Sequence, residues 1–151
     1  MKNKNAKGLF DETFRLEKLS KQGDPLLLTK EKINWNIFRP LLNNIFVNKD
    51  KGQSGREPYD YLMMFKILLL QKYYNLSDDQ TDYQILDRLS FMRFLDLELS
   101  DKVPDSKTIL LFKETLSKSG KIKEFFNIFA RMLEAQGYIG KERKIVDASF
   151  V

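Results

Sequence analysis

One stretch, residues 57–74, constrains the fold more than any other part of the chain. Its sequence, EPYDYLMMFKILLLQKYY, is apolar nearly all round a helix, and such a helix is normally buried. Pro58 suits a first helical turn and Asn75 suits a left-handed stop, so we expect a helix from Pro58 to Tyr74 about 25 Å long. The polar side chains that we expect to face water are Asp60, Lys66, Gln71 and Lys72. The rest of the chain should therefore wrap this helix.

Membrane insertion and export fit the sequence poorly. The uncharged run is shorter than the roughly 20 residues that a bilayer needs, and Lys66 interrupts it. The first residues, MKNKNAKG, are basic but lead into charged residues rather than an apolar segment, unlike a signal peptide. We expect a cytoplasmic protein that has no membrane partner.

Composition narrows the classes of function. A chain of 151 residues with 42% hydrophobic content can bury one core, so we expect one compact domain. The absence of Cys and His excludes disulfides, Cys/His zinc sites, Ser-His-Asp triads and cysteine nucleophiles, so any metal must be held by carboxylates. The 26 Lys and Arg exceed the 21 Asp and Glu, and the net charge of +5 favours a polyanionic partner.

The chain before the central helix predicts a basic tail and two helices. Residues 1–8 carry three lysines and little to bury, which is typical of a mobile tail. A helix is expected at 11–21, and the Gly, Asp and Pro at 23–25 end it. Apolar residues at helical spacing predict a second helix over 33–46, which Pro40 either kinks or opens in its second half. We assign its aromatic residues to packing rather than to base stacking.

Residues 47–56, VNKDKGQSGR, form the clearest surface loop in the sequence. The loop contains two glycines and leads into a helix N-terminus. The charges of Lys49, Lys51 and Arg56, the backbone N–H groups and the helix dipole would add up there to attract a phosphate. A solvated connection fits the same residues equally well. Both interpretations remain open at this point.

A capping box formed by Ser77 and Gln80 predicts the start of a further helix. Acidic residues in a first turn are favoured by the helix dipole, so we interpret those near this start as structural rather than as metal ligands. They are Asp78, Asp79 and Asp82. Ser90 is predicted to cap a short following turn, which leaves Arg88 and Arg93 for the surface.

The segment that starts at Pro104 carries a pattern that favours DNA recognition. Asp105 or Ser106 can cap a helix, and the buried face of that helix is expected to be Ile109, Phe112 and Leu116. Two short helices, a loop and this third helix resemble a helix-turn-helix, in which early residues of the recognition helix meet DNA. Such triplets occur in any all-α domain, so the pattern is weak on its own. Its candidate base contacts are Lys107, Thr108 and Lys113.

The last part of the chain changes from helical period to strand period. Residues 121–136 are amphipathic, with an apolar stripe that packs on the core or on a partner, and Gly137 ends them. In GKERKIVDASFV the apolar residues alternate, which predicts a strand over 145–150. One strand forms no stable sheet, and nothing earlier in the sequence offers a partner.

Three blocks of the chain resemble a known family. They are GREPYDYLMMFKILLLQKYYNLSDDQTDYQILDRLSFMRFL, DKVPDSKTILLFKETL and KIVDASFV. They look like the N-terminal part of bacterial insertion-sequence transposases of the insertion-sequence-five group, over about residues 8–151. The resemblance implies a helical DNA-binding region followed by an RNase H-like catalytic domain, which uses an Asp, Asp, Glu triad on a divalent metal, Mg²⁺.

The resemblance carries over to one catalytic residue. The first Asp of the family's triad lies in a motif resembling IVDAS, which places it at Asp147 here. The second Asp and the Glu would lie beyond Val151. Two-metal phosphoryl transfer needs several hard oxygen ligands, so one carboxylate cannot hold the metal pair. We therefore expect these residues alone to hold no cofactor and to be inactive, with Asp147 an Mg²⁺ ligand only in a complete enzyme.

Together these expectations describe an all-α helical bundle, with a helix-turn-helix-like segment around one buried central helix and a C-terminal β-strand remnant of an RNase H-like domain. They divide the chain into a basic tail at 1–8, a DNA-binding domain at 9–137 and the first strand of a truncated catalytic domain at 138–151. The predicted phosphate contacts are Lys49, Lys51, Arg56, Arg88 and Arg93.

Two functional hypotheses follow from different classes. The first is a truncated transposase that binds double-stranded DNA at the terminal inverted repeats of its element, without a complete catalytic site. The second is a protein-interaction module, in which the helix at 121–136 and the unpaired strand dimerise with another transposase chain or inhibit it.

Overall fold

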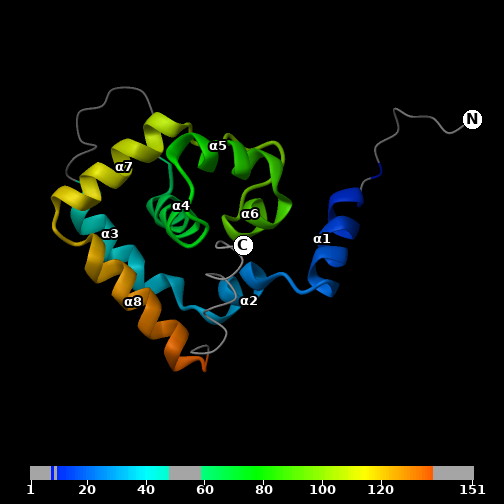
Figure 1. The fold of residues 1–151 in the computed structure, drawn as a ribbon, viewed down its shortest axis with the longest axis horizontal. Coiled ribbons are helices and arrows are strands. Elements are labelled where there is room, and N and C mark those ends of the chain that lie inside the picture. Colours follow the sequence, from blue (N-terminus) through cyan, green and yellow to red (C-terminus); the bar gives the residue numbers. More distant parts are fainter. Residues whose placement is uncertain (1–7, 9, 48–58, 138–151) are drawn as a thin grey trace, which may run out of the picture.

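The computed structural model describes residues 8, 10–47 and 59–137, and within them every regular element is helical (Figure 1). The predicted all-α class is confirmed for these residues. The strand expected at 145–150 lies outside the described residues. The elements are α1 (Asp11–Lys21), α2 (Pro25–Lys32), the 3₁₀ helix η1 (Trp35–Ile37), α3 (Phe38–Phe46), α4 (Tyr61–Tyr73), α5 (Asp78–Asp87), α6 (Leu89–Phe94), α7 (Ser106–Lys118) and α8 (Ile122–Ala135).

Helix α4 lies at the centre of the bundle, and every residue of its segment 62–70 is buried (Figure 1). The helix begins later than the sequence suggests, because Asp60 is its N-cap and accepts a 3.1 Å hydrogen bond from the Met63 backbone N–H. The predicted left-handed stop is confirmed, since Asn75 has φ 52°. None of the described helices has the length and apolar character needed to cross a membrane.

Two polar residues of α4 that were expected to face water are buried instead. Lys66 is only 3% exposed and Gln71 only 6%. The expectation was wrong because a helix that is covered on every side has no side left for water. The polar ends of both side chains therefore need partners inside the protein.

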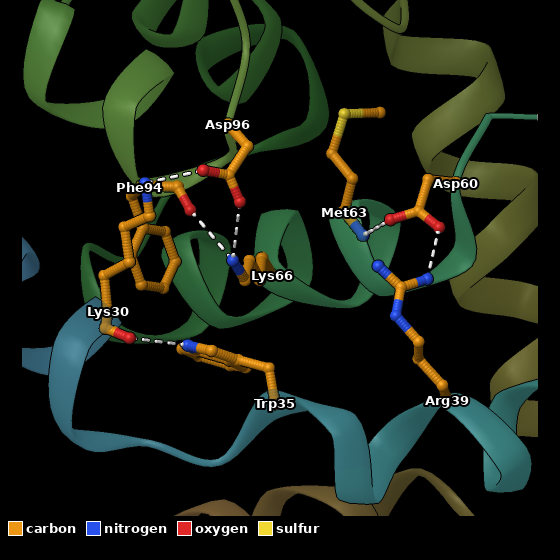
Figure 2. A network of polar contacts seen from close by, with 8 residues as sticks. All are labelled: Lys30, Trp35, Arg39, Asp60, Met63, Lys66, Phe94 and Asp96. Carbon is orange, nitrogen blue, oxygen red and sulfur yellow. Dashed lines mark hydrogen bonds and ion pairs between the residues drawn. The ribbon is translucent and has the colours of Figure 1, made fainter.

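The Lys66 ammonium has these partners (Figure 2). Its Nζ donates a 3.1 Å hydrogen bond to the Phe94 carbonyl oxygen, lies 3.6 Å from the Asp96 carboxylate and is 4.6 Å from the centroid of the Trp35 ring. Burial lowers the pKa of Lys66, and the Asp96 charge opposes this shift. The ammonium therefore connects α4 to η1 and to the end of α6.

Asp96 lies between two lysines at the end of α6 (Figure 2). Lys30 Nζ is 2.6 Å from its carboxylate, and the Lys30 carbonyl oxygen accepts a 2.9 Å hydrogen bond from Trp35 Nε1. Burial alone would raise the pKa of Asp96, but hydrogen bonds and charge from Lys30 and Lys66 lower it. This cluster joins α2, η1, α4 and α6 through charged and aromatic groups together.

Helix α2 is absent from the sequence-based expectations. The residues at 23–25 were interpreted only as the end of α1, and Gly23 does end it with φ 88°. Asp24 then caps α2 by accepting a 3.0 Å hydrogen bond from the Leu26 backbone N–H, while Pro25 occupies the first helical turn. One short segment thus ends one helix and starts the next.

Pro40 opens a helix rather than kinking one. The helix expected over 33–46 is divided into η1 and α3, and Pro40 lies in the first turn of α3, where its missing N–H leaves no hydrogen bond unmade. The aromatic residues of this segment pack, as expected. Phe38 has no exposed surface, and the Trp35 ring lies 5.5 Å from the Phe94 ring.

Helix α8 attaches to α3 and α4 through aromatic rings. The Phe125 ring is 6.1 Å from that of Phe38 and 5.5 Å from that of Phe65, and the Phe129 ring is 5.7 Å from that of Tyr73. The predicted apolar stripe of α8 is confirmed as a packing face, since Phe125 and Phe129 are 2% and 1% exposed.

The starts of α5 and α7 follow the predicted capping chemistry, whereas the start of α6 does not. Ser77 Oγ accepts from the Gln80 N–H at 3.1 Å, and Gln80 Oε1 accepts from the Ser77 N–H at 3.0 Å. Asp105 caps α7. Helix α6 begins at Leu89, so Ser90 lies inside it and is not its cap.

The buried Lys66 generates a stability prediction. Lys66→Met keeps most of the apolar contact with Trp35 and Phe94 but leaves the buried Phe94 carbonyl oxygen without the donor that it has in the wild type. We expect the free energy of unfolding to fall by about 1–3 kcal/mol in urea denaturation.

The matched control is Lys107→Met, at an exposed lysine of α7. It should change the free energy of unfolding by no more than about 0.5 kcal/mol. Equal effects of the two substitutions would contradict a structural role for the Lys66 ammonium.

Candidate nucleic-acid interface

Arg93 was predicted to be a surface residue, but its guanidinium is largely enclosed, with 14% of the side chain exposed. It lies 2.7 Å from the Asp24 carboxylate, which is itself only 6% exposed, and it donates to Ser20 Oγ at 2.8 Å. A further bond goes to the Leu16 carbonyl oxygen at 3.2 Å. Arg93 on α6 therefore holds α1 and the start of α2 in place.

Arg88 lies exposed at the junction of α5 and α6. Its guanidinium carbon is 4.4 Å from the centroid of the Phe91 ring and 5.4 Å from that of Tyr74. Burial raises the pKa of Tyr74, and the Arg88 charge opposes that shift. Within the described part of the chain no carboxylate forms an ion pair with Arg88. Its charge is positioned by the rings beneath it and is available to an external anion.

The three candidates on α7 do not share one face. Residues advance by about 100° along a helix, so Lys107, Thr108 and Lys113 point in three different directions. Lys107 is exposed and has no ion pair among the described residues. Thr108 is half-buried, and its backbone N–H donates to the Asp105 carboxylate at 2.8 Å.

The Lys113 side chain contacts α5 and is only partly exposed to solvent. Its Nζ is 2.8 Å from the Asp78 carboxylate and 3.3 Å from Gln71 Oε1. Burial alone would raise the pKa of Asp78, but hydrogen bonds from Lys113 and Gln71 and the Lys113 charge lower it. The pairing gives Asp78 a structural role, as its place in the first turn of α5 suggested.

The helices packed near α7, the loop before it and the charges beside it can be compared with those of a helix-turn-helix. Helix α7 packs on α5, and α5 packs on α6. Residues 95–105 separate α6 from α7, whereas the motif uses a turn of about three or four residues. The neighbouring α5 also presents acidic side chains with no ion pair among the described residues, which repel phosphates: Asp79, Asp82 and Asp87. The helix-turn-helix assignment stays a prediction.

The remaining candidates lie outside the described residues. They are Lys49, Lys51, Arg56 and Asp147. In the described ranges, no group of three or more Asp or Glu side chains is placed to hold a metal ion. The described helices therefore offer no fit for a carboxylate-bound metal pair, and Asp147 stays a prediction.

Charge is distributed unevenly along the sequence. Residues 8, 10–47 and 59–137 contain as many Asp and Glu as Lys and Arg, so the described helical body has no formal net charge. The whole excess of +5 comes from the segments 1–7, 48–58 and 138–151. A general attraction to a polyanion must therefore originate mainly in those segments, with individual contributions from exposed cations such as Arg88 and Lys107.

The sequence did not predict the carboxylates that form ion pairs with two of the candidate cations. Asp24, which pairs with Arg93, comes from a segment interpreted only as a turn, although its position before Pro25 is a typical helix start. Asp78, which pairs with Lys113, was correctly placed in a first turn. Nothing in the local pattern connects it to a lysine on another helix.

Comparison with known proteins gives one family. A family model described as "Transposase domain (DUF772)" matches residues 14–115, which is more than half of the chain. The matched region runs from α1 into α7 and includes the buried central helix α4. No solved structure matches the chain.

The contacts of the two arginines predict different mutational effects. Arg93→Ala leaves the buried Asp24 carboxylate unpaired, so we expect the free energy of unfolding to fall by about 3 kcal/mol. Arg88→Ala removes only the contacts of an exposed guanidinium with two rings and should lower it by about 0.5–1 kcal/mol. Urea denaturation of both variants measures the difference, and a smaller loss for Arg93→Ala would argue against its role in holding α1 and α2.

The Asp78 pair predicts a pH dependence. The folded-state pKa of Asp78 is lowered, so its contribution to stability is present above about pH 4 and is lost as the pH falls through that lowered pKa. Because Lys113 is 37% exposed, the contribution should stay below about 1 kcal/mol. Thermal denaturation of wild type and Asp78→Asn from about pH 7 to pH 2 should show two curves that converge in acid. A gap that stays constant with pH would contradict the charge pair.

Proposed function

We propose that this chain, which belongs to the transposase domain (DUF772) family, binds double-stranded DNA at the terminal inverted repeats of a bacterial insertion sequence. The match over residues 14–115 carries the proposal, because it covers most of the described helical body. The resemblance to the insertion-sequence-five group, which rests on three blocks of sequence, supports the finer assignment.

The charge distribution supports two groups of DNA contacts, one in the segment 48–58 and one on the described helices. Lys49, Lys51 and Arg56 belong to a segment with excess positive charge, and they supply the phosphate contacts that give affinity. Arg88 and Lys107 supply contacts from the helical body, because both are exposed and neither has a carboxylate partner among the described residues. The neutral body limits non-specific attraction elsewhere.

The other three candidates act less directly in this proposal. The charges of Arg93 and Lys113 are already paired with Asp24 and Asp78. A DNA phosphate would have to compete with a carboxylate less than 3 Å from each cation. Thr108 contributes mainly through its position in the first turn of α7.

DNA cleavage by these 151 residues alone is not part of the proposal. The resemblance assigns one triad carboxylate, Asp147, and implies that two further carboxylates complete the Mg²⁺ site. Mg²⁺ bound to a complete triad would supply Lewis-acid activation of phosphoryl transfer. The described helices would then supply DNA binding and orientation.

The interaction-module hypothesis loses support at the site first chosen for it. The apolar stripe of α8 is used inside this chain, where Phe125, Phe129 and Leu133 are at most 2% exposed. The strand at 145–150, the other surface of this hypothesis, lies outside the described residues.

The DNA proposal predicts a strong salt dependence. Fluorescence anisotropy with duplex from the ends of the element should show tighter binding than scrambled duplex, and the binding constant should fall steeply as salt rises from about 50 to 200 mM. Replacing Lys49, Lys51 and Arg56 together by Gln should reduce the slope of log K against log salt by about 2 to 3.

Lys113→Gln is the matched control, because it removes a lysine charge that is paired inside the protein. It should leave the slope unchanged, whereas Lys107→Gln should reduce it by about 1. Binding that is insensitive to salt, or a control that acts like the triple variant, would contradict the proposed contacts.

A further inference from the structure

Helix α1 carries an apolar and basic stripe that the other described residues do not cover. The helix has no buried residue, and the Phe10 and Phe14 side chains are each 57% exposed, with their ring centroids 6.4 Å apart. Lys18 follows at the same helical spacing, Lys21 lies on the same side, and the exposed Glu17 lies between them and Phe14. Neither lysine forms an ion pair in the part of the chain that the structure describes. The α1 stripe is defined as Phe10, Phe14, Lys18 and Lys21.

Helix α5 carries a second uncovered stripe, of opposite charge. Tyr83 is 64% exposed and Leu86 is 63% exposed, although the other side of this helix is completely buried at Thr81 and Ile85. Asp79 and Asp87 flank the two apolar side chains at helical spacing, and both are exposed. The α5 stripe is defined as Asp79, Tyr83, Leu86 and Asp87.

The two stripes cannot meet within one chain. Helices α1 and α5 both pack against α6. The α1 stripe lies away from Leu16 and Ser20, which Arg93 of α6 contacts, and the α5 stripe lies away from the buried Thr81 and Ile85. Moving α1 onto α5 of the same chain would break the contacts of Arg93 with Leu16 and Ser20. Among the described residues, neither stripe can therefore cover the other in the same chain, and a second molecule can supply the opposite surface.

The stripes match in length and in the spacing of their apolar side chains, and their alignment can bring one lysine opposite one aspartate. Helices α1 and α5 have 11 and 10 residues. An antiparallel alignment places Lys18 opposite Asp79 and Phe14 opposite Tyr83, and Phe10 then lies opposite Leu86.

We propose that two copies of this chain associate by docking the α1 stripe of each copy on the α5 stripe of the other. A twofold pair contains this contact twice and buries all the exposed aromatic side chains of both stripes. Each contact is only one short helix against another, so the association should be weak and dependent on concentration. This surface differs from α8 and does not depend on DNA binding.

Sedimentation equilibrium of the purified chain without DNA tests the proposal. The weight-average mass should rise toward twice that of one chain as the concentration increases from about 5 to 500 μM. Lys18→Glu and Asp79→Lys should each shift the dimer dissociation constant upward by about tenfold, because each places like charges opposite one another. The variant carrying both changes should recover the wild-type dissociation constant.

Controls separate this contact from general charge effects and from unfolding. Lys123→Glu reverses an exposed lysine on α8, outside both stripes, and should leave self-association unchanged. Phe14→Ser should weaken association while its thermal midpoint stays close to that of wild type, since the ring is 57% exposed. A monomer at every concentration overturns the proposal, as does failure of the double reversal to recover association or an equal effect of Lys123→Glu.

Discussion

The burial of α4 on every side is the constraint on which the structure depends. Its segment 62–70 leaves no face for water, so other helices must surround it. A lysine in the middle of such a helix is unfavourable unless its ammonium is satisfied. Lys66 meets this requirement with a backbone carbonyl, the Asp96 carboxylate and the Trp35 ring. The helices that cover α4 are thus also the source of its polar contacts.

Some charged side chains are paired inside the fold, so fewer of them are available to bind a partner. Arg93 and Lys113 join helices through Asp24 and Asp78, and these pairs make part of the basic content structural. The described body is left without net charge. Family membership and sequence resemblance point to DNA, and the charge distribution divides the candidate contacts between exposed cations on helices and the basic segment at 48–58.

Local chemistry allowed much of the fold to be predicted. The capping box at Ser77, the Asp105 cap, the left-handed Asn75 and the apolar faces of α7 and α8 each depend on residues within a few positions of one another. The predictions failed where one residue has two roles, or where the partner of a side chain lies far away along the sequence. Asp24 follows the end of one helix and caps the next, so α2 was missed.

The sequence by itself determined the helical class, the buried central helix and the candidate cations, because periodicity, capping and composition are local properties. Only the tertiary structure decided which of the cations in the described residues are paired and which are not. The partners of Arg93 lie 69 to 77 positions away along the chain, and the Phe94 oxygen that satisfies Lys66 lies 28 positions away. No periodic pattern encodes such pairings. They follow from how helices pack around α4, and they separate the charges that are paired inside the protein from those that stay exposed.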